Sequence, residues 1–155
     1  MSNYGDMKSR IADEIADSTL SSQIVLAINS AIKHHERREF YFNTKTGTFL
    51  TVAGQEYYGS AANSDIPSII RILDPMKVLS SGYKYDITSA PFSEIDSSQD
   101  GNITGTPRHR AYFAEQIRLY PIPTDAETVT LSYIYRLTAL STDSDTNAWT
   151  DDAEE

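Results

Sequence analysis

The chain has 155 residues, of which 39% are hydrophobic; it contains no cysteine and its net charge is −9. This size and composition suit one globular domain, or a small domain with an appendage, and exclude disulfide bonds and thiolate metal sites. The sequence has no apolar run near the roughly 18 residues that a membrane span needs, and it has no secretion signal. We therefore expect a soluble, unexported protein without membrane contact.

The negative charge belongs to the C-terminal part of the chain. Residues 121–155 contain eight acidic side chains and only one basic side chain, Arg136, whereas residues 1–45 contain six of each kind. A protein that grips nucleic acid by its phosphates carries a basic stripe, and the sequence shows none. Sequence-specific binding to nucleic acid is therefore not expected.

Two helices are predicted at the N-terminus. Residues 6–17 predict a short amphipathic helix with Asp6 as its N-cap, because apolar side chains recur there at i, i+4 spacing. A second, stronger helix begins near Ser21 or Ser22 and ends in a basic last turn, which suits the negative end of a helix dipole. The short connection between them favours a helical hairpin. The apolar positions are Met7, Ile11 and Ile15 in the first helix and Ile24, Ile28, Ala31, Ile32 and His35 in the second.

After the second helix the sequence is rich in aromatic and β-branched residues and is punctuated by glycines, which is typical of β-strands. Asp74 and Pro75 are expected to end one strand, and two hairpins are expected to turn at residues 80–82 and 114–116. Residues 91–99 predict one short helix. The expected strands cover residues 41–42, 46–52, 55–58, 68–73, 76–79, 83–88, 108–113, 117–120 and 128–137.

Helices come first and strands follow, which argues for an α+β fold rather than a parallel βαβ sheet. We expect a helical hairpin that packs in an oligomer over residues 1–39, and an antiparallel β domain of about six to eight short strands with one short helix over residues 40–142. Residues 143–155 are expected to form an acidic connector and the start of a C-terminal helix capped by Thr150 or Asp151. A helix cut after one turn is not stable alone. We therefore expect the natural protein to continue beyond Glu155, or this tail to order only against a partner.

Two patterns suggest a metal site, and both have a simpler interpretation. His34 and His35 are neighbours on a helix and point about 100° apart, so they cannot share one ion; cations at a helix C-terminus are the favoured interpretation. Residues 143–154 place acidic side chains at the ligand positions of an EF-hand calcium loop, but Ala148 stands where that loop needs glycine, and a strand precedes it. A solvated acidic loop that caps a helix is therefore favoured.

The sequence shows no signature of an enzyme. It has no Gly-x-Ser-x-Gly motif, no phosphate-binding glycine-rich loop and no cysteine nucleophile. We therefore predict a protein without catalytic residues, cofactor or metal. The ten tyrosines suggest a sugar-binding face, although half-buried strand positions explain them more simply.

An ordered set of segments carries a resemblance to a known family. After the helical pair come residues 48–58 (TFLTVAGQEYY), 104–108 (TGTPR), 116–123 (QIRLYPIP) and 128–133 (TVTLSY), and then a polar loop that ends in Asn147, Ala148 and Trp149. Over most of its length the chain resembles the head-to-tail adaptor (connector) proteins of tailed bacteriophages. In such proteins one or more further helices follow, whereas this sequence stops at Glu155.

The resemblance implies a non-enzymatic structural protein of the virion neck, assembled in the cytoplasm of the bacterial host. About twelve copies would form a ring between portal and tail and extend the DNA channel. The implied partners are other copies of this chain, the portal protein, and tail or neck proteins; DNA would pass through without sequence-specific binding.

Two sets of candidate residues follow. An acidic lining would let a polyanion slide rather than stick, so Asp143, Asp145, Asp151 and Asp152 are candidates to face the channel or a subunit boundary. The helical hairpin is the expected ring-packing element, with Ile24, Ile28 and Ile32 as its candidate packing residues.

Two other classes of function stay open at this point. A β-rich ligand-binding module, such as a carbohydrate-binding or receptor-binding tail domain, is the main alternative. A small hydrolase with a site assembled from dispersed acidic residues is a third and weaker interpretation.

Overall fold

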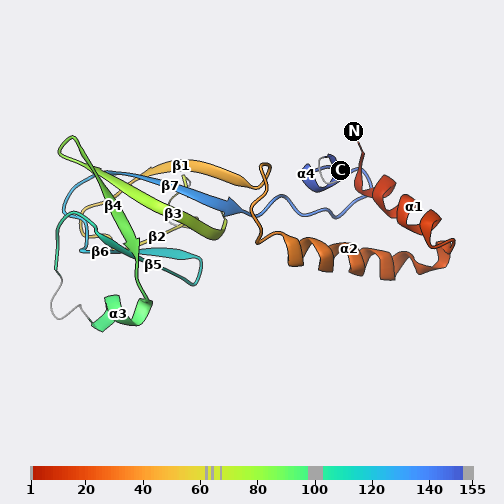
Figure 1. The fold of residues 1–155 in the computed structure, drawn as a ribbon, viewed down its shortest axis with the longest axis horizontal. Helices are drawn as coiled ribbons and strands as arrows, with labels where there is room; N and C mark the ends of the chain where they lie inside the picture. Colours follow the sequence, from red (N-terminus) through yellow and green to blue (C-terminus); the bar gives the residue numbers. More distant parts are fainter. Residues whose placement is uncertain (1, 62, 64, 67, 98–102, 152–155) are drawn as a thin grey trace. The chain divides into compact units, whose positions relative to one another are not determined.

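The computed structural model describes residues 2–61, 63, 65–66, 68–97 and 103–151. The chain divides into two units, shown in Figure 1. The helical unit consists of Met1–Asn43 together with Arg136–Glu155, and the sheet unit consists of Thr44–Tyr135. The chain therefore enters the sheet unit once, leaves it once, and returns to the unit in which it began.

The helical unit contains α1 (Tyr4–Glu14), a 3₁₀ turn η1 (Ser18–Leu20), α2 (Ser21–His35) and the short α4 (Ala148–Asp151). Asn3, and not Asp6, is the N-cap of α1: its side chain accepts a hydrogen bond from the Asp6 N–H (2.9 Å), and the Asp6 carboxylate accepts one from the Asn3 N–H (3.1 Å). The expected N-cap is therefore wrong. The helix starts earlier because Tyr4 is a core residue, 2% exposed, and Asp6 completes a capping box from inside the first turn.

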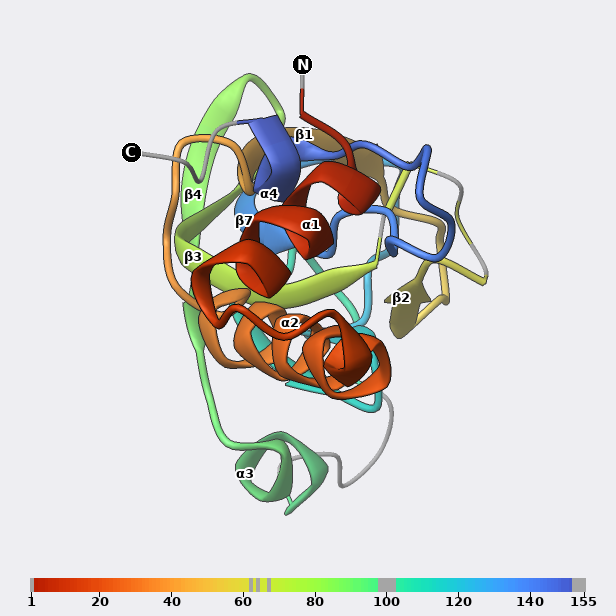
Figure 2. The same ribbon diagram turned by 90° about the vertical axis from the view of Figure 1, so that its right-hand side faces the viewer.

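Two N-terminal helices are present as predicted, and α1 lies along α2 in Figures 1 and 2. Their shared core contains Tyr4, Ile24 and Ile28, together with Leu140 from the segment that follows the last strand. Met7, Ile11, Ala12 and Ile32 pack against this core and are partly buried. In the part of the chain that the structure describes, no helix has both the length and the apolar character to cross a membrane.

The sheet unit is a seven-stranded sheet with one short helix, α3 (Phe92–Ser97), which confirms the predicted fold class. Its strand order is β1-β7-β3-β4-β5-β6-β2. The pairing is antiparallel except between β4 and β5, which run parallel for a short stretch because the chain passes through α3 between them. The strands are β1 (Thr44–Leu50), β2 (Tyr57–Gly59), β3 (Ile69–Ser80), β4 (Tyr83–Ser89), β5 (His109–Phe113), β6 (Gln116–Tyr120) and β7 (Thr128–Tyr135).

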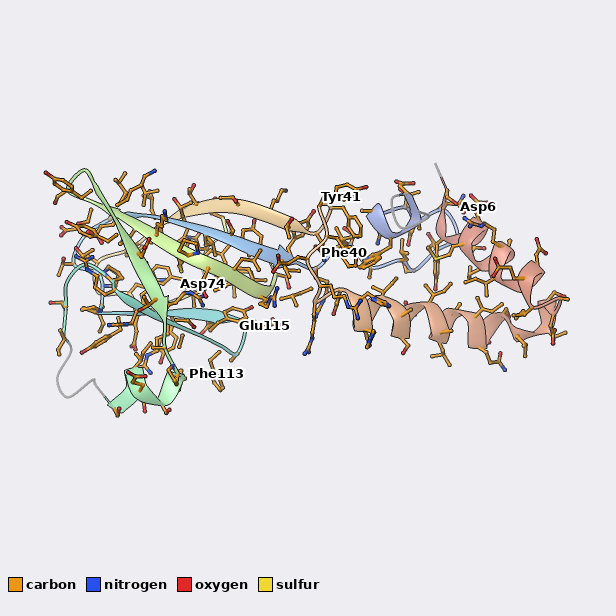
Figure 3. All side chains as sticks on the ribbon, viewed as in Figure 1. Asp6, Phe40, Tyr41, Asp74, Phe113 and Glu115 are labelled. Atoms are coloured by element: carbon orange, nitrogen blue, oxygen red, sulfur yellow. The ribbon has the colours of Figure 1, made fainter. Side chains whose placement is uncertain are left out.

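Both predicted hairpins are confirmed. Ser81 and Gly82, with φ of 49° and 81°, join β3 to β4, and Ala114 and Glu115, with φ of 50° and 60°, join β5 to β6. Positive φ at both central residues is the signature of the two-residue turn that matches the twist of the strands. Figure 3 shows Glu115 at the β5–β6 turn.

Two local predictions were wrong. Asp74 and Pro75 do not end a strand, because β3 runs through them to Ser80. A register shift against β7 at this point accommodates Pro75, which has no N–H to donate to the ladder. Residues 41–42, expected in a strand, lie in a turn instead.

The sheet curls, so that its two edge strands approach each other. The rings of Phe49 in β1 and Tyr58 in β2 lie 5.2 Å apart. The Tyr58 hydroxyl accepts a hydrogen bond from the Val52 N–H (3.1 Å) and donates to the Gln55 carbonyl (2.9 Å), which fixes the connection between these strands. The enclosed core contains Phe49, Tyr58, Ile66, Ile69, Ile72, Met76, Val78, Ile87, Ile117, Leu119, Val129, Leu131 and Tyr133.

A buried arginine joins β6 to the segments around β2 and α3. The side chain of Arg118 in β6 is 3% exposed and pairs with the carboxylates of Glu56 and Asp96, the latter at 3.0 Å. Its guanidinium also stacks near the rings of Tyr57 and Phe92, at 5.4 and 4.8 Å from their centroids. One charged group therefore holds β2 and α3 to β6.

Replacing Arg118 with methionine should lower the free energy of unfolding by about 3–5 kcal/mol, because the pairing of this 3% exposed guanidinium with Glu56 and Asp96 would be lost. Asp96→Asn should cost about 1 kcal/mol or less, since Asp96 is 64% exposed. Urea unfolding of the two variants measures the difference. Equal losses would contradict a buried charge pair, and Arg118→Met combined with Glu56→Met should recover most of the loss.

Candidate functional site

An open apolar groove with a volume of about 530 Å³ lies on the helical unit. It exists because Ala27 and Ala31 of α2 have side chains too short to fill the space beside α1. Polar side chains lie at its rim. The groove is lined by Met7, Arg10, Ile11, Glu14, Ala27, Ile28, Ala31, Ile32, His35 and Trp149.

Trp149 reaches this groove from α4. Asn147 caps that helix: its side chain accepts a hydrogen bond from the Trp149 N–H (2.8 Å), and its own N–H donates to the Thr150 hydroxyl (3.1 Å). The expected N-cap, Thr150 or Asp151, is therefore wrong by three or four positions. The helix begins earlier because Trp149 has to be inside it to reach the core.

Two aromatic side chains hold Trp149 in place. Its ring stands edge-on to Phe40 at 5.5 Å and to Phe42 at 5.1 Å, and those two rings stack on each other at 5.1 Å. Figure 3 shows Phe40 on the segment that follows α2. Because strand pairing was expected here, the cluster was not predicted. Three aromatic residues in succession at the end of a helix were the signal for it.

Asp145 organises the turn that leads into α4. Its carboxylate accepts hydrogen bonds from the N–H groups of Ser141 (2.6 Å) and Thr142 (2.7 Å) and from both hydroxyls. The Thr142 side chain, then the Thr142 and Ser141 N–H groups, hold the pKa of Asp145 well below its ordinary value. This side chain is therefore committed to the local fold.

The other predicted acidic residues differ in accessibility. The Asp143 side chain is 78% exposed and forms an ion pair with Lys8. Asp151 is half-buried at the end of α4. Asp152 lies outside the described residues. Their role at a channel or subunit boundary stays a prediction.

The three predicted packing residues of α2 have different environments. Ile24 and Ile28, each 5% exposed, fill the core of their own unit. Ile32 is half-buried and lines the groove. A role for them between copies stays a prediction, and Ile32 is the one that the groove leaves accessible.

A second hollow of about 540 Å³ adjoins the first at Ile32 and Trp149 and has charged walls. Lys33 and Arg37 line it from α2 and the residues that follow. Glu36 lines it too and pairs with Arg136 at 3.4 Å. The groove is therefore apolar along α1 and polar towards the end of α2.

The sheet unit exposes apolar side chains near one end. Leu50 of β1 and Leu79 of β3 both lie opposite Thr128 of β7, so the three share one face of the sheet. Leu50 is 56% exposed and Leu79 is 41% exposed, and Tyr83, at the nearby hairpin, is 69% exposed. We call Leu50 and Leu79 the outer patch; Tyr83 pairs with Ser80 and therefore belongs to the other face of the sheet.

No group of side chains suited to a metal occurs among the described residues. The rings of His34 and His35 meet edge to face, with centroids 4.9 Å apart, instead of converging on one point. The third position of the suspected calcium loop is Asp145, whose oxygens are occupied by the turn.

A family model described as SU10 adaptor protein matches residues 2–155. No curated protein matches the chain.

The turn at Asp145 makes a prediction about pH. The folded pKa of Asp145 is lowered from its ordinary value of 3.8, so the stability that this carboxylate contributes is complete above that value and is lost as pH falls through the lower, folded pKa. Asp145→Asn should therefore be less stable than wild type near neutral pH, and the gap should shrink below a pH of about 4. Fluorescence of Trp149, the only tryptophan, measures unfolding by urea at each pH.

Asp143→Asn is the matched control for this prediction, because its side chain is mostly exposed and should change stability little at any pH. A gap between wild type and Asp145→Asn that is the same at neutral and acid pH would contradict the assigned role of this carboxylate.

Proposed function

Since this chain belongs to the SU10 adaptor protein family, we propose that it is the head-to-tail adaptor of a tailed phage. Family membership makes it a phage adaptor protein, a structural kind of protein that binds other virion proteins. The finer proposal is a ring of about twelve copies in the virion neck, between portal and tail, which extends the channel for DNA. The observation that carries it is the family match over residues 2–155.

The division into two units supports a role between neighbours. An adaptor needs at least two contact surfaces, and each unit offers one of its own. The helical unit has the apolar groove beside Trp149, and the sheet unit has the outer patch around Leu79. Exposed apolar surface of this kind marks sites of protein contact.

The distribution of charge supports passage of DNA without binding. The eight acidic residues of 121–155 face only one basic residue, so this part of the chain repels a polyanion. The exposed Asp143 is the best candidate for a channel or boundary position, because Asp145 is occupied by its own turn.

We expect the purified protein to form a ring-sized species, either alone or after addition of the portal protein of the same phage. Sedimentation velocity and electron microscopy of negatively stained particles measure the mass and the shape. A stable monomer or trimer that does not bind the portal protein but binds glycans would contradict the proposed adaptor function. It would support the β-rich ligand-binding module instead.

Neutralising Asp143, Asp151 and Asp152 to asparagine should leave folding intact and impair DNA ejection or ring assembly, because a channel lining would lose its repulsion of DNA. Asp145 is kept so that the turn survives. The control neutralises three acidic residues of the sheet unit, Asp86, Glu94 and Asp125, with the same change in net charge. Normal assembly and ejection by both variants would refute the acidic lining.

A further inference from the structure

The two long helices of the helical unit turn their polar sides in opposite directions. Tyr4 and Ile11 of α1 and Ile24 and Ile28 of α2 face one shared core. The apolar sides of α1 and α2 face each other across this core. The side of each helix opposite its apolar side therefore points away from the other helix. Figure 2 shows the two helices side by side.

The exposed side of α1 is acidic. Asp6 and Asp13 are seven residues apart, so they lie on one side of the helix, opposite Tyr4 and Ile11. Glu14 and Arg10 are also exposed, and both line the apolar groove beside α2, at the edge of this acidic side. Asp143, next to Gly5, adds a further exposed acid at the start of the helix.

The exposed side of α2 is basic towards its end. Leu26 and Lys33 are seven residues apart in α2, which places them on the side opposite Ile24 and Ile28, and Arg37 follows two residues after the end of the helix. Leu26 is 70% exposed. Lys33 and Arg37 pair with no carboxylate in the part of the chain that the structure describes. Glu36, the nearest acid in sequence, is taken by Arg136.

We propose that the acidic side of α1 in one copy docks on the basic end of α2 in the next copy. This contact rests on the proposed ring, and it names the surfaces that build it. The two sides differ in charge and point in opposite directions, so one copy can use both at once. Such a head-to-tail contact is the heterologous kind that generates rings, whereas a two-fold contact between identical sides would bring like charges together.

Exposed ion pairs are individually weak and are screened by salt. Burial of Leu26 beside them supplies the apolar part of the contact. Association of copies should therefore weaken as salt rises, without being abolished.

Two charge-reversed variants test the contact. In one, Lys33→Glu and Arg37→Glu make both sides acidic; in the other, Asp13→Lys and Glu14→Lys make both sides basic. Asp6 is kept because it belongs to the capping box of α1. The matched control, Lys45→Glu with Lys77→Glu, reverses two exposed lysines of the sheet unit. Thermal unfolding followed at Trp149 shows that each variant is folded.

Sedimentation velocity over a range of concentrations then measures association. Each variant alone should associate roughly tenfold or more weakly than wild type, and an equal mixture of the two should regain association, because every contact again joins opposite charges. The control should behave like wild type.

The outcomes separate this inference from the ring itself. If the wild-type protein associates and both variants and their mixture associate equally well, the proposed contact is wrong, and the proposed ring is unaffected. Variants that self-associate normally but no longer bind the portal overturn it too, because the basic end would then serve a different partner. A wild type that forms no assembly, alone or with the portal, overturns both.

Discussion

Two backbone hydrogen bonds join the ends of the described chain, and the helical unit depends on them. The N–H groups of Tyr4 and Gly5 donate to the carbonyls of Asp145 and Asp143, each at 2.9 Å. These are groups that the first turn of a helix leaves without an internal partner. Two helices of 11 and 15 residues enclose little core by themselves, so the returning segment, which adds Leu140, completes the unit.

The same returning segment explains why the acidic residues near the C-terminus are not equivalent. The Asp145 carboxylate accepts hydrogen bonds from residues 141 and 142, and these hydrogen bonds lower its pKa. Asp143 supplies its carbonyl to α1 and leaves its carboxylate outside. Spacing along the sequence suggested one loop with several equal ligands. In the fold, one acid is structural and its neighbour is available at the surface.

Most of the fold could be predicted because its signals are local. The helix faces, both two-residue turns and the position of α3 depend on residues within a few places of each other. The errors arose where contacts between residues far apart in the sequence determine the local structure. Pro75 lies within β3 because β7 shifts its register there, and Phe42 joins a cluster with Trp149 instead of a strand. The groove depends on Ala27 and Ala31 facing a helix whose placement no local pattern fixes.

A net charge of −9 on every copy opposes the gathering of many copies. At an ionic strength near 0.1 M, however, charges more than about 10 Å apart are largely screened, while charges in direct contact are not. The repulsion between whole copies is therefore largely screened, whereas an attraction between opposite charges in direct contact is kept. In the proposed contact between copies, the basic charge of Lys33 and Arg37 is confined to one small area of this acidic chain. Copies can then attract one another at short range while the acidic C-terminal part still repels DNA.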